Sequence, residues 1–279
     1  MTSLFAMCLG LLLFGAPQQD KLFDHHLATL KADFGSATVQ QQVMGAAKLL
    51  AGIQYKDKTL EGNQTEQLVV RLDAFDCVTY VESVLALVAC LQNGESTYAD
   101  YQRHLTSLRY RSGKIDGYPS RLHYSCDWAF DNGLRGNMHD VTKDIGGELR
   151  DKEISFMSRH RSAYAALAED DANLAAIKTV EADINTREYY FIPEARLRAL
   201  ENKIQDGDVL ALTTKIEHLD IAHLGFAVHV KGRLHLLHAS SKHGKVLVSP
   251  ETLEDMLKAS SSRNGVMVFR PLAAKHAQP

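Results

Sequence analysis

The chain of 279 residues contains only four cysteines and one tryptophan, and it has no long basic run. With a formal net charge of -3 as well, it lacks the electrostatic footprint of a protein that binds nucleic acid, heparin or a membrane surface. The few cysteines argue against the disulfide framework of small secreted domains. A hydrophobic fraction of 45% and a charged fraction of 23% are instead typical of a globular protein with an ample core.

The apolar run at residues 4–16 is too short to span a bilayer, which takes about 20 residues. At the N-terminus such a run is typical of a signal peptide, although no lysine or arginine precedes it. Phe14 stands where a signal peptide normally has a small residue before the cleavage site, and Pro17 follows Ala16. We predict a signal peptide over residues 1–18, export to the periplasm, and one domain over residues 19–279. A buried first helix is the alternative.

Removal of the signal peptide would leave Cys77, Cys90 and Cys126. An odd number of cysteines leaves at least one thiol unpaired, which favours a working cysteine over a structural one. Cys90 lies inside an apolar stretch, and we interpret it as a core residue. The partner of Cys126 is left open.

Residues 77–91 are strongly apolar, with hydrophobic side chains at steps of three and four, which predicts a buried helix. These side chains are Val81, Val84, Leu85, Val88 and Leu91. Residues 93–94 (Asn-Gly) end the helix, and Asp76 is the predicted N-cap. Cys77 then lies in the first turn, where the helix dipole favours the nucleophilic thiolate and the Asp76 charge opposes it. The alternative is a small hydrophobic residue at a helix start.

The rest of the chain divides into helices followed by strands, which predicts an α+β fold with an antiparallel sheet. Predicted helices cover residues 20–32, 38–50, 97–110, 127–134 and 250–259, and residues 140–205 read as polar and mostly helical. Predicted strands cover residues 208–213, 223–230, 233–240, 245–249 and 266–270.

Five histidines gather in the predicted sheet: His223, His229, His235, His238 and His243. Residues 231–232 (Lys-Gly) predict a two-residue hairpin loop, so that the numbers of paired residues sum to 463. In this register His223 and His238 are diagonal neighbours on one face, whereas His235 lies on the other.

The face with His223 also carries Gly225 and Ala227, whose small side chains would let a helix approach the sheet. A helix that bears Cys77 could dock there, with the thiol as nucleophile and His223 as base. A neutral His238 would orient His223 by accepting its Nδ1 proton. Two alternatives stay open: surface histidines, or a zinc site with a third ligand, although the chain has no His-Glu-x-x-His helix.

Four short motifs carry a resemblance to a known family. Residues 75–79 (FDCVT), 222–226 (AHLGF) and 237–240 (LHAS) resemble the three motifs of the NlpC superfamily of papain-like cell-wall hydrolases. Residues 118–128 (YPSRLHYSCDW) are similar to its N-acetylmuramoyl-L-alanine amidase-like branch. The resemblance covers about residues 22–271. One departure is His218, which stands where relatives carry glycine.

The resemblance implies an exported bacterial enzyme with a papain-like core, in which the catalytic cysteine begins a buried helix packed on the sheet. It would cleave the amide between N-acetylmuramic acid and L-alanine in peptidoglycan or muropeptides, with no cofactor or metal. It implies Cys77 as nucleophile, His223 as base and His238 as the third polar residue. The expected partners are peptidoglycan fragments. Binding to nucleic acid and stable membrane insertion after processing are not expected.

The segment at residues 118–128 also suits a substrate wall by its chemistry. Arg121 can pair with a carboxylate of the stem peptide, and Trp128 can stack on a sugar ring. One of the tyrosines could help to hold an oxyanion beside the Cys77 backbone N–H. Packing is the alternative for Tyr124 and Trp128. The predicted substrate-binding residues are Tyr118, Ser120, Arg121, His123, Tyr124, Asp127 and Trp128.

The predicted triad does not select the bond that is cut. A stem-peptide endopeptidase, which cleaves between D-glutamate and the diamino acid, would use the same three residues. An acyltransferase is a further alternative, and so is a catalytically inactive wall-binding module. The inactive module is disfavoured because all three triad positions are filled.

Overall fold

The structure is a computed structural model that describes residues 16–63 and 65–273. The predicted signal peptide at residues 1–18 lies outside this range except for its last three residues, which begin helix α1 (Ala16–Phe34). Within the described residues, no helix is both long enough and apolar enough to cross a membrane.

Most helices precede the long strands, as the sequence predicts. The other helices are α2 (Val39–Leu49), α3 (Cys77–Asn93), α4 (Tyr98–Arg109), α5 (Ser125–Leu134), α6 (Phe156–Arg159), α7 (Ala165–Ala168), α8 (Asp171–Ile184), α9 (Glu194–Leu200) and α10 (Leu253–Lys258). The strands are β1 (Gln54–Tyr55), β2 (Ala74–Phe75), β3 (Met138–Asp140), β4 (Glu148–Leu149), β5 (Tyr190–Pro193), β6 (Val209–Thr214), β7 (Ile221–Val230), β8 (Arg233–Ser240), β9 (Lys245–Val248) and β10 (Arg263–Pro271).

The strands form one sheet in the order β2-β1-β9-β8-β7-β6-β10-β5-β4, and β3 pairs with β10 outside this path. Strands β1 and β2 are parallel, and the other pairs are antiparallel. The predicted sheet was purely antiparallel, so the β1–β2 pair corrects that detail. The α+β class is confirmed.

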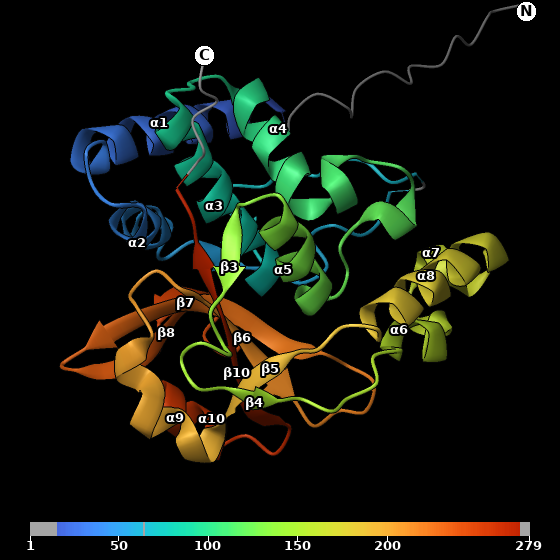
Figure 1. Cartoon of the computed structure of the whole chain (residues 1–279). Helices are drawn as coiled ribbons and strands as arrows, with labels where there is room; N and C mark the ends of the chain where they lie inside the picture. Colours follow the sequence, from blue (N-terminus) through green and yellow to red (C-terminus); the bar gives the residue numbers. More distant parts are fainter. Residues whose placement is uncertain (1–15, 64, 274–279) are drawn as a thin grey trace, which may run out of the picture.

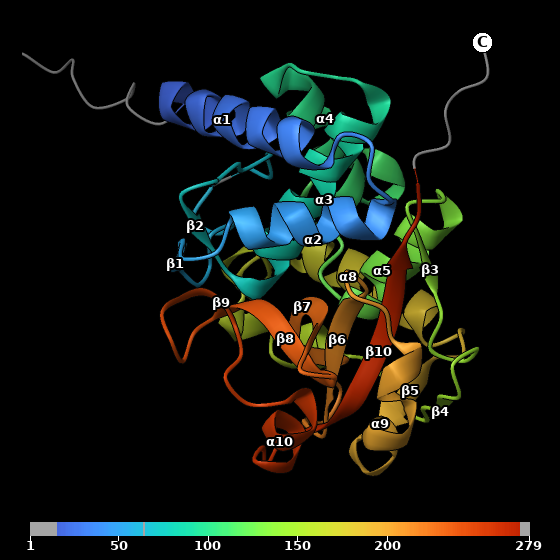
Figure 2. The same ribbon diagram turned by 90° about the vertical axis from the view of Figure 1, so that its left-hand side faces the viewer.

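The sheet separates two hydrophobic clusters. Figures 1 and 2 show α1 to α5 on one side of the sheet and α9 and α10 on the other. The larger cluster joins the first helices to the sheet face that carries Leu224, Phe226 and Leu237. The smaller cluster joins the opposite face, with Ala227 and Leu236, to α9 and α10.

Helix α3 is the central helix of the larger cluster, and its bounds confirm the prediction. The Asp76 side chain accepts a hydrogen bond from the Thr79 backbone N–H at 2.8 Å, which forms the predicted N-cap. Gly94 ends the helix in the left-handed conformation, with φ of 68°. In the first turns, Tyr80 packs edge-on against Phe226 of β7, with ring centroids 5.7 Å apart.

The hairpin of β7 and β8 confirms the predicted register. Val230 pairs with Arg233, and the pairing continues without a break to Phe226 and Leu237. Residues 231–232 both have positive φ, as the tight hairpin turn requires.

The predicted docking face of the cysteine helix is wrong. Helix α3 packs against Phe226 and its neighbours, not against Gly225 and Ala227. The space beside Gly225 is filled from within the sheet, because a Cβ there would lie 2.9 Å from both the His238 Cβ and the Leu236 side chain. Glycine therefore serves the packing of β7 on β8.

The interpretation of residues 140–205 as mostly helical is wrong in part. Strand β3 ends at residue 140, and strands β4 and β5 interrupt the helices within this region. These strands have two to four residues, too few to show a period of two, and β5 pairs with β10, far along the chain.

We expect Gly225→Ala to lower the free energy of unfolding by about 1–3 kcal/mol, because the added methyl group overpacks the contact with His238. Gly133→Ala in α5 is the matched control, since its Cβ would meet nothing closer than 3.7 Å. Urea titration of both variants provides the measurement. Equal midpoints for the two variants would contradict the proposed close packing.

Candidate active site

Cys77 is the first residue of α3, and its neighbour Asp76 is held on two sides. Besides capping Thr79, the Asp76 carboxylate accepts a hydrogen bond from the Thr59 hydroxyl at 2.8 Å. The backbone N–H groups of Cys77 and Val78 belong to the first helical turn and favour the thiolate.

A β-bulge precedes the histidine pair. Leu212 of β6 pairs with His223, but the next residue, Thr213, pairs with Ile221, so Ala222 is the extra residue. Bulges bend a strand and redirect its side chains, and they are frequent beside active sites. His223 thus lies at the point where the bulge changes the alternation of side chains between the two faces of β7.

His223 and His238 form a close, buried pair. Nε2 of His223 lies 2.6 Å from Nδ1 of His238, and the two rings are almost perpendicular, at 88°. The prediction that the Nδ1 atom of His223 faces His238 is wrong, because Nε2 is the atom that faces it. His238 Nε2 is buried and has no hydrogen-bond partner in the part of the chain that the structure describes.

The thiol lies against the strand that carries the pair. The backbone N–H of Leu224, the residue after His223, faces the Cys77 thiol and lowers its pKa, and Arg263 of β10 interacts electrostatically with Cys77, His223 and His238. The Cys77 thiol and both imidazoles therefore lie within electrostatic range of the same Arg263 guanidinium.

Burial keeps the resting site uncharged. It raises the pKa of the Cys77 thiol to about 11, and the negative charge of Asp76 adds to the effect. Burial also lowers the pKa of His223 to about 3, with His238 and Arg263 contributing. The same cause, followed by Arg263, lowers the pKa of His238 to about 4. At neutral pH the site holds a thiol and two neutral imidazoles.

A cavity of about 350 Å³ lies beside the first turn of α3. Its lining contains three cationic and three anionic side chains, so it has no strong net charge. The lining residues are Lys58, Leu60, Glu61, Asp76, Val78, Glu82, Arg109, Arg121, Leu122, His123, Ala163, Tyr164 and Ala165. Burial lowers the pKa of His123 to about 3, which makes this residue a neutral part of the wall.

Arg121 is the buried cation of this cavity, with a side chain only 6% exposed. It donates hydrogen bonds to the Leu60 carbonyl at 3.3 Å and to the Glu61 carboxylate at 3.0 Å. Its Nε has no hydrogen-bond partner among the described residues, and the nearest carboxylate, of Glu66, is 3.6 Å away. The guanidinium carbon lies 5.0 Å from the centre of the Tyr118 ring, which supports it from behind.

Two aromatic residues of the predicted wall belong to the core. The Tyr124 hydroxyl donates to Glu181 at 2.7 Å and accepts from the Met157 backbone N–H at 2.8 Å, which ties α5 to α6 and α8. Trp128 is 2% exposed and packs in the larger hydrophobic cluster. The packing alternative fits both residues, and neither reaches the cavity.

Ser120 and Asp127 hold the wall in place. The Ser120 hydroxyl donates to the Gly117 carbonyl at 2.7 Å within the loop before α5. The Asp127 carboxylate is fully buried between Arg111, at 2.5 Å, and Arg187, at 2.8 Å. Of the seven predicted wall residues, only Arg121 and His123 line the cavity.

Four residues close to the site are not among the predicted site residues. Tyr55 and Arg263 both interact electrostatically with Cys77, and both come from strands far from it in the chain. Glu82 and Arg109 form a buried ion pair of 2.7 Å at the cavity. Glu82 had a visible signal, because it is the one charged residue in the apolar stretch at residues 77–91.

The fold and the site define an α+β protein with a cysteine at a helix start and a buried histidine pair. The family model of the N-acetylmuramoyl-L-alanine amidase-like (AmiA-like) proteins matches residues 46–266, and the chain belongs to that family. Among curated proteins, none matches the chain.

Solved structures agree with this assignment. A crystal structure of an N-acetylmuramoyl-L-alanine amidase from Bacteroides uniformis is 36% identical, with a TM-score of 0.80 and coverage of 84% of this chain and 99% of that one. A second structure described in the same words is 37% identical, with a TM-score of 0.78 and coverage of 82% and 98%. A Legionella pneumophila protein at 24% identity covers 92% and 95%, with a TM-score of 0.69, and shows the shared fold.

We expect iodoacetamide to label Cys77 before Cys90 and Cys126, which are buried and have pKa values raised further. Because the thiol and not the thiolate dominates at neutral pH, the labelling rate should rise about tenfold per pH unit between about pH 7 and about pH 9. Peptide mass spectrometry gives the rate for each site. A rate at Cys77 that does not change with pH would show a preformed thiolate.

Proposed function

We propose that the protein is a papain-like cysteine amidase that cleaves the bond between N-acetylmuramic acid and L-alanine in peptidoglycan fragments. The observation that carries the proposal is the Cys77 thiol at the start of α3, beside the hydrogen-bonded His223–His238 pair and a cavity with a buried arginine. Membership of the amidase-like family supplies the substrate class.

The first step couples proton transfer to attack, because the resting thiol and imidazoles are neutral. Nδ1 of His223 takes the proton from Cys77 Sγ while the sulfur bonds to the lactyl carbonyl carbon. The π electrons of the carbonyl move to its oxygen. The Nε2–H of His223 donates to Nδ1 of His238, which orients the ring and stabilises its positive form.

The second step releases the peptide. The tetrahedral intermediate collapses, the C–N bond breaks, and Nδ1 of His223 gives its proton to the amino group of L-alanine. The remaining thioester is then attacked by water, whose proton passes to His223 and back to the sulfur. The products are a free carboxylate on the sugar acid and a peptide with a free amine.

The start of α3 supplies donors for the oxyanion. The Cys77 and Val78 backbone N–H groups lie in the turn where a helix has no internal acceptors, next to the sulfur. Tyr55 is a better candidate than Tyr118 or Tyr124 for a hydroxyl donor, because it interacts electrostatically with Cys77.

The cavity gives a place for the stem peptide. Arg121 can exchange its contact with Glu61, a rim residue with a side chain 42% exposed, for a carboxylate of the substrate. The Nε of Arg121, which makes no hydrogen bond within the described residues, offers a further donor. The proposal includes export to the periplasm, supported by the apolar run at residues 4–16 and by the location of this substrate.

The decisive experiment is incubation with defined muropeptides and mass spectrometry of the products. Release of the intact stem peptide with a free N-terminal alanine supports the amidase. Cleavage after D-glutamate would replace it with the endopeptidase, and binding without any cleavage would replace it with a wall-binding module.

The three histidine variants should separate by role. We expect Cys77→Ala and His223→Ala each to lower kcat by about 10³-fold or more, because nucleophile and base act as a unit. His238→Ala should cost about 10²-fold, since it orients His223 and moves no proton to or from the substrate. His235 faces away and bonds the Ser249 carbonyl, so His235→Ala is the control with a near-normal rate. A His238→Ala variant as active as the control would contradict the triad.

Arg121→Lys should lower kcat/KM for a muropeptide by about 10- to 100-fold, because an ammonium group cannot make the paired contacts of a guanidinium. Amidation of the stem carboxylates should lower kcat/KM of the wild type by a similar factor. It should lower kcat/KM of the Arg121→Lys variant only slightly, because the substrate carboxylate and Arg121 are the two partners of one contact. Arg196→Lys, in an exposed ion pair with Glu148, is the matched control. Additive losses in the variant would exclude Arg121 as the carboxylate partner.

A further inference from the structure

A second cluster of reactive side chains lies at the far end of α3 from Cys77. One ligand atom each from Cys90, Glu95 and His104 lies within 4.8 Å of the other two. Cys90 is fully buried, whereas the side chains of His104 and Glu95 are 20% and 26% exposed. Within the described residues, no other group of three such side chains meets this criterion.

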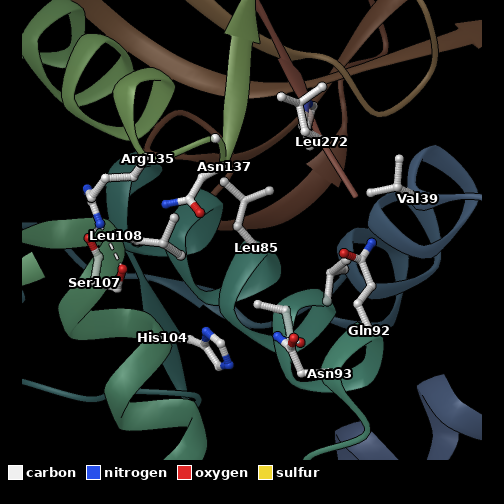
Figure 3. Close-up of a pocket in the computed structure, with 14 residues that line it drawn as sticks. Val39, Leu85, Gln92, Asn93, His104, Ser107, Leu108, Arg135, Asn137 and Leu272 are labelled. Atoms are coloured by element: carbon white, nitrogen blue, oxygen red, sulfur yellow. Dashed lines mark hydrogen bonds between the residues drawn. The ribbon is translucent and has the colours of Figure 1, made fainter. Parts of the chain in front are cut away.

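Local structure brings the three residues together. Cys90 lies in the last turn of α3, and Gly94 turns the chain so that the Glu95 N–H donates to the Cys90 carbonyl at 3.0 Å. His104 projects from α4, which packs beside α3, into the space between the two helices (Figure 3). The residues thus come from two helices and the loop that joins them.

The carboxylate and the imidazole are already oriented. Nε2 of His104 lies 2.5 Å from one Glu95 oxygen, and Arg103 donates to the other oxygen at 2.7 Å. Arg103 is itself fixed by Asp100, at 2.7 Å. Supporting contacts of this kind orient the ligands of protein metal sites.

We propose that Cys90, Glu95 and His104 bind a divalent transition-metal ion of the Zn²⁺ class. A thiolate, an imidazole and a carboxylate are the three ligand types that Zn²⁺ uses in proteins. The ion would lie between the Glu95 carboxylate and the His104 imidazole, and it would need a small rearrangement of their side chains. His104 also lines a cavity of about 300 Å³, which gives access and room for a water as fourth ligand.

The sulfur of Cys90 lies in a predominantly negative environment. The carboxylates of Glu95 and Asp100 are within electrostatic range of it, and the Arg103 guanidinium opposes them. The same carboxylates attract a dication, and binding would release the thiol proton. The ion would join the end of α3 to α4 and would not enter the catalytic steps.

The test uses the full chain with Cys77→Ala, because Cys77 is less buried than Cys90 and would compete for the metal. Titration with Co²⁺ should give a thiolate-to-cobalt charge-transfer band that saturates at one equivalent and disappears when Zn²⁺ is added. Cys90→Ser should abolish the band, and His104→Gln should weaken binding by about 10- to 100-fold. His139→Gln, an exposed histidine beside Asp144, is the matched control and should bind normally.

Thermal unfolding gives a second readout that does not depend on the buried Cys90 variant folding. Excess Zn²⁺ should raise the Tm of the Cys77→Ala protein by about 5 °C and that of His104→Gln by much less. The proposal is overturned if no cobalt band forms, if the band survives Cys90→Ser, or if Zn²⁺ stabilises His104→Gln as strongly as its parent. None of these measurements involves hydrolysis, so their outcome is independent of the proposed amidase activity.

Discussion

Helix α3 lies between the other helices and the sheet, and burial along its length fixes the position of its first residue. Because Tyr80 packs on Phe226, the first turn is held against β7 just beyond the bulge at Ala222. The thiol position therefore depends on the hydrophobic core and not on flexible loops. Rigid elements of this kind hold reacting groups in place more precisely than loops do.

The same burial determines the charge state of the site. Removal of water disfavours a thiolate and an imidazolium. The negative charge of Asp76 further disfavours the thiolate of Cys77, and the positive charge of Arg263 further disfavours the imidazolium of His223. The helix dipole and the backbone N–H groups at the start of α3 favour the thiolate but do not outweigh these effects. The proposed chemistry thus begins from neutral partners, and charge develops only when the substrate carbonyl can accept it.

Much of the fold and part of the site could be predicted from the sequence. The apolar period of α3, its cap at Asp76 and the two-residue hairpin loop are local signals, and they placed His223 beside His238 correctly. The docking face of α3 was predicted wrongly because two kinds of neighbour require a glycine at residue 225. Either a helix packed on the sheet or the His238 side chain leaves no room for a Cβ there. Tyr55 and Arg263 were missed because strand pairing over long sequence distances brings them to the site. Arg121 and His123 of the segment at residues 118–128 line the cavity, but which side chains of this segment face it depends on packing around Trp128.

A protonated thiol has a further consequence for a protein that we propose to work outside the cytoplasm. Peroxides attack the thiolate, and with a pKa of about 11 only about one Cys77 thiol in 10⁴ is ionised at neutral pH. Conversion to sulfenic acid is slow for such a residue, and mixed disulfides form slowly for the same reason. The burial that keeps the proposed nucleophile protonated also slows the oxidation of Cys77 in an oxidising compartment.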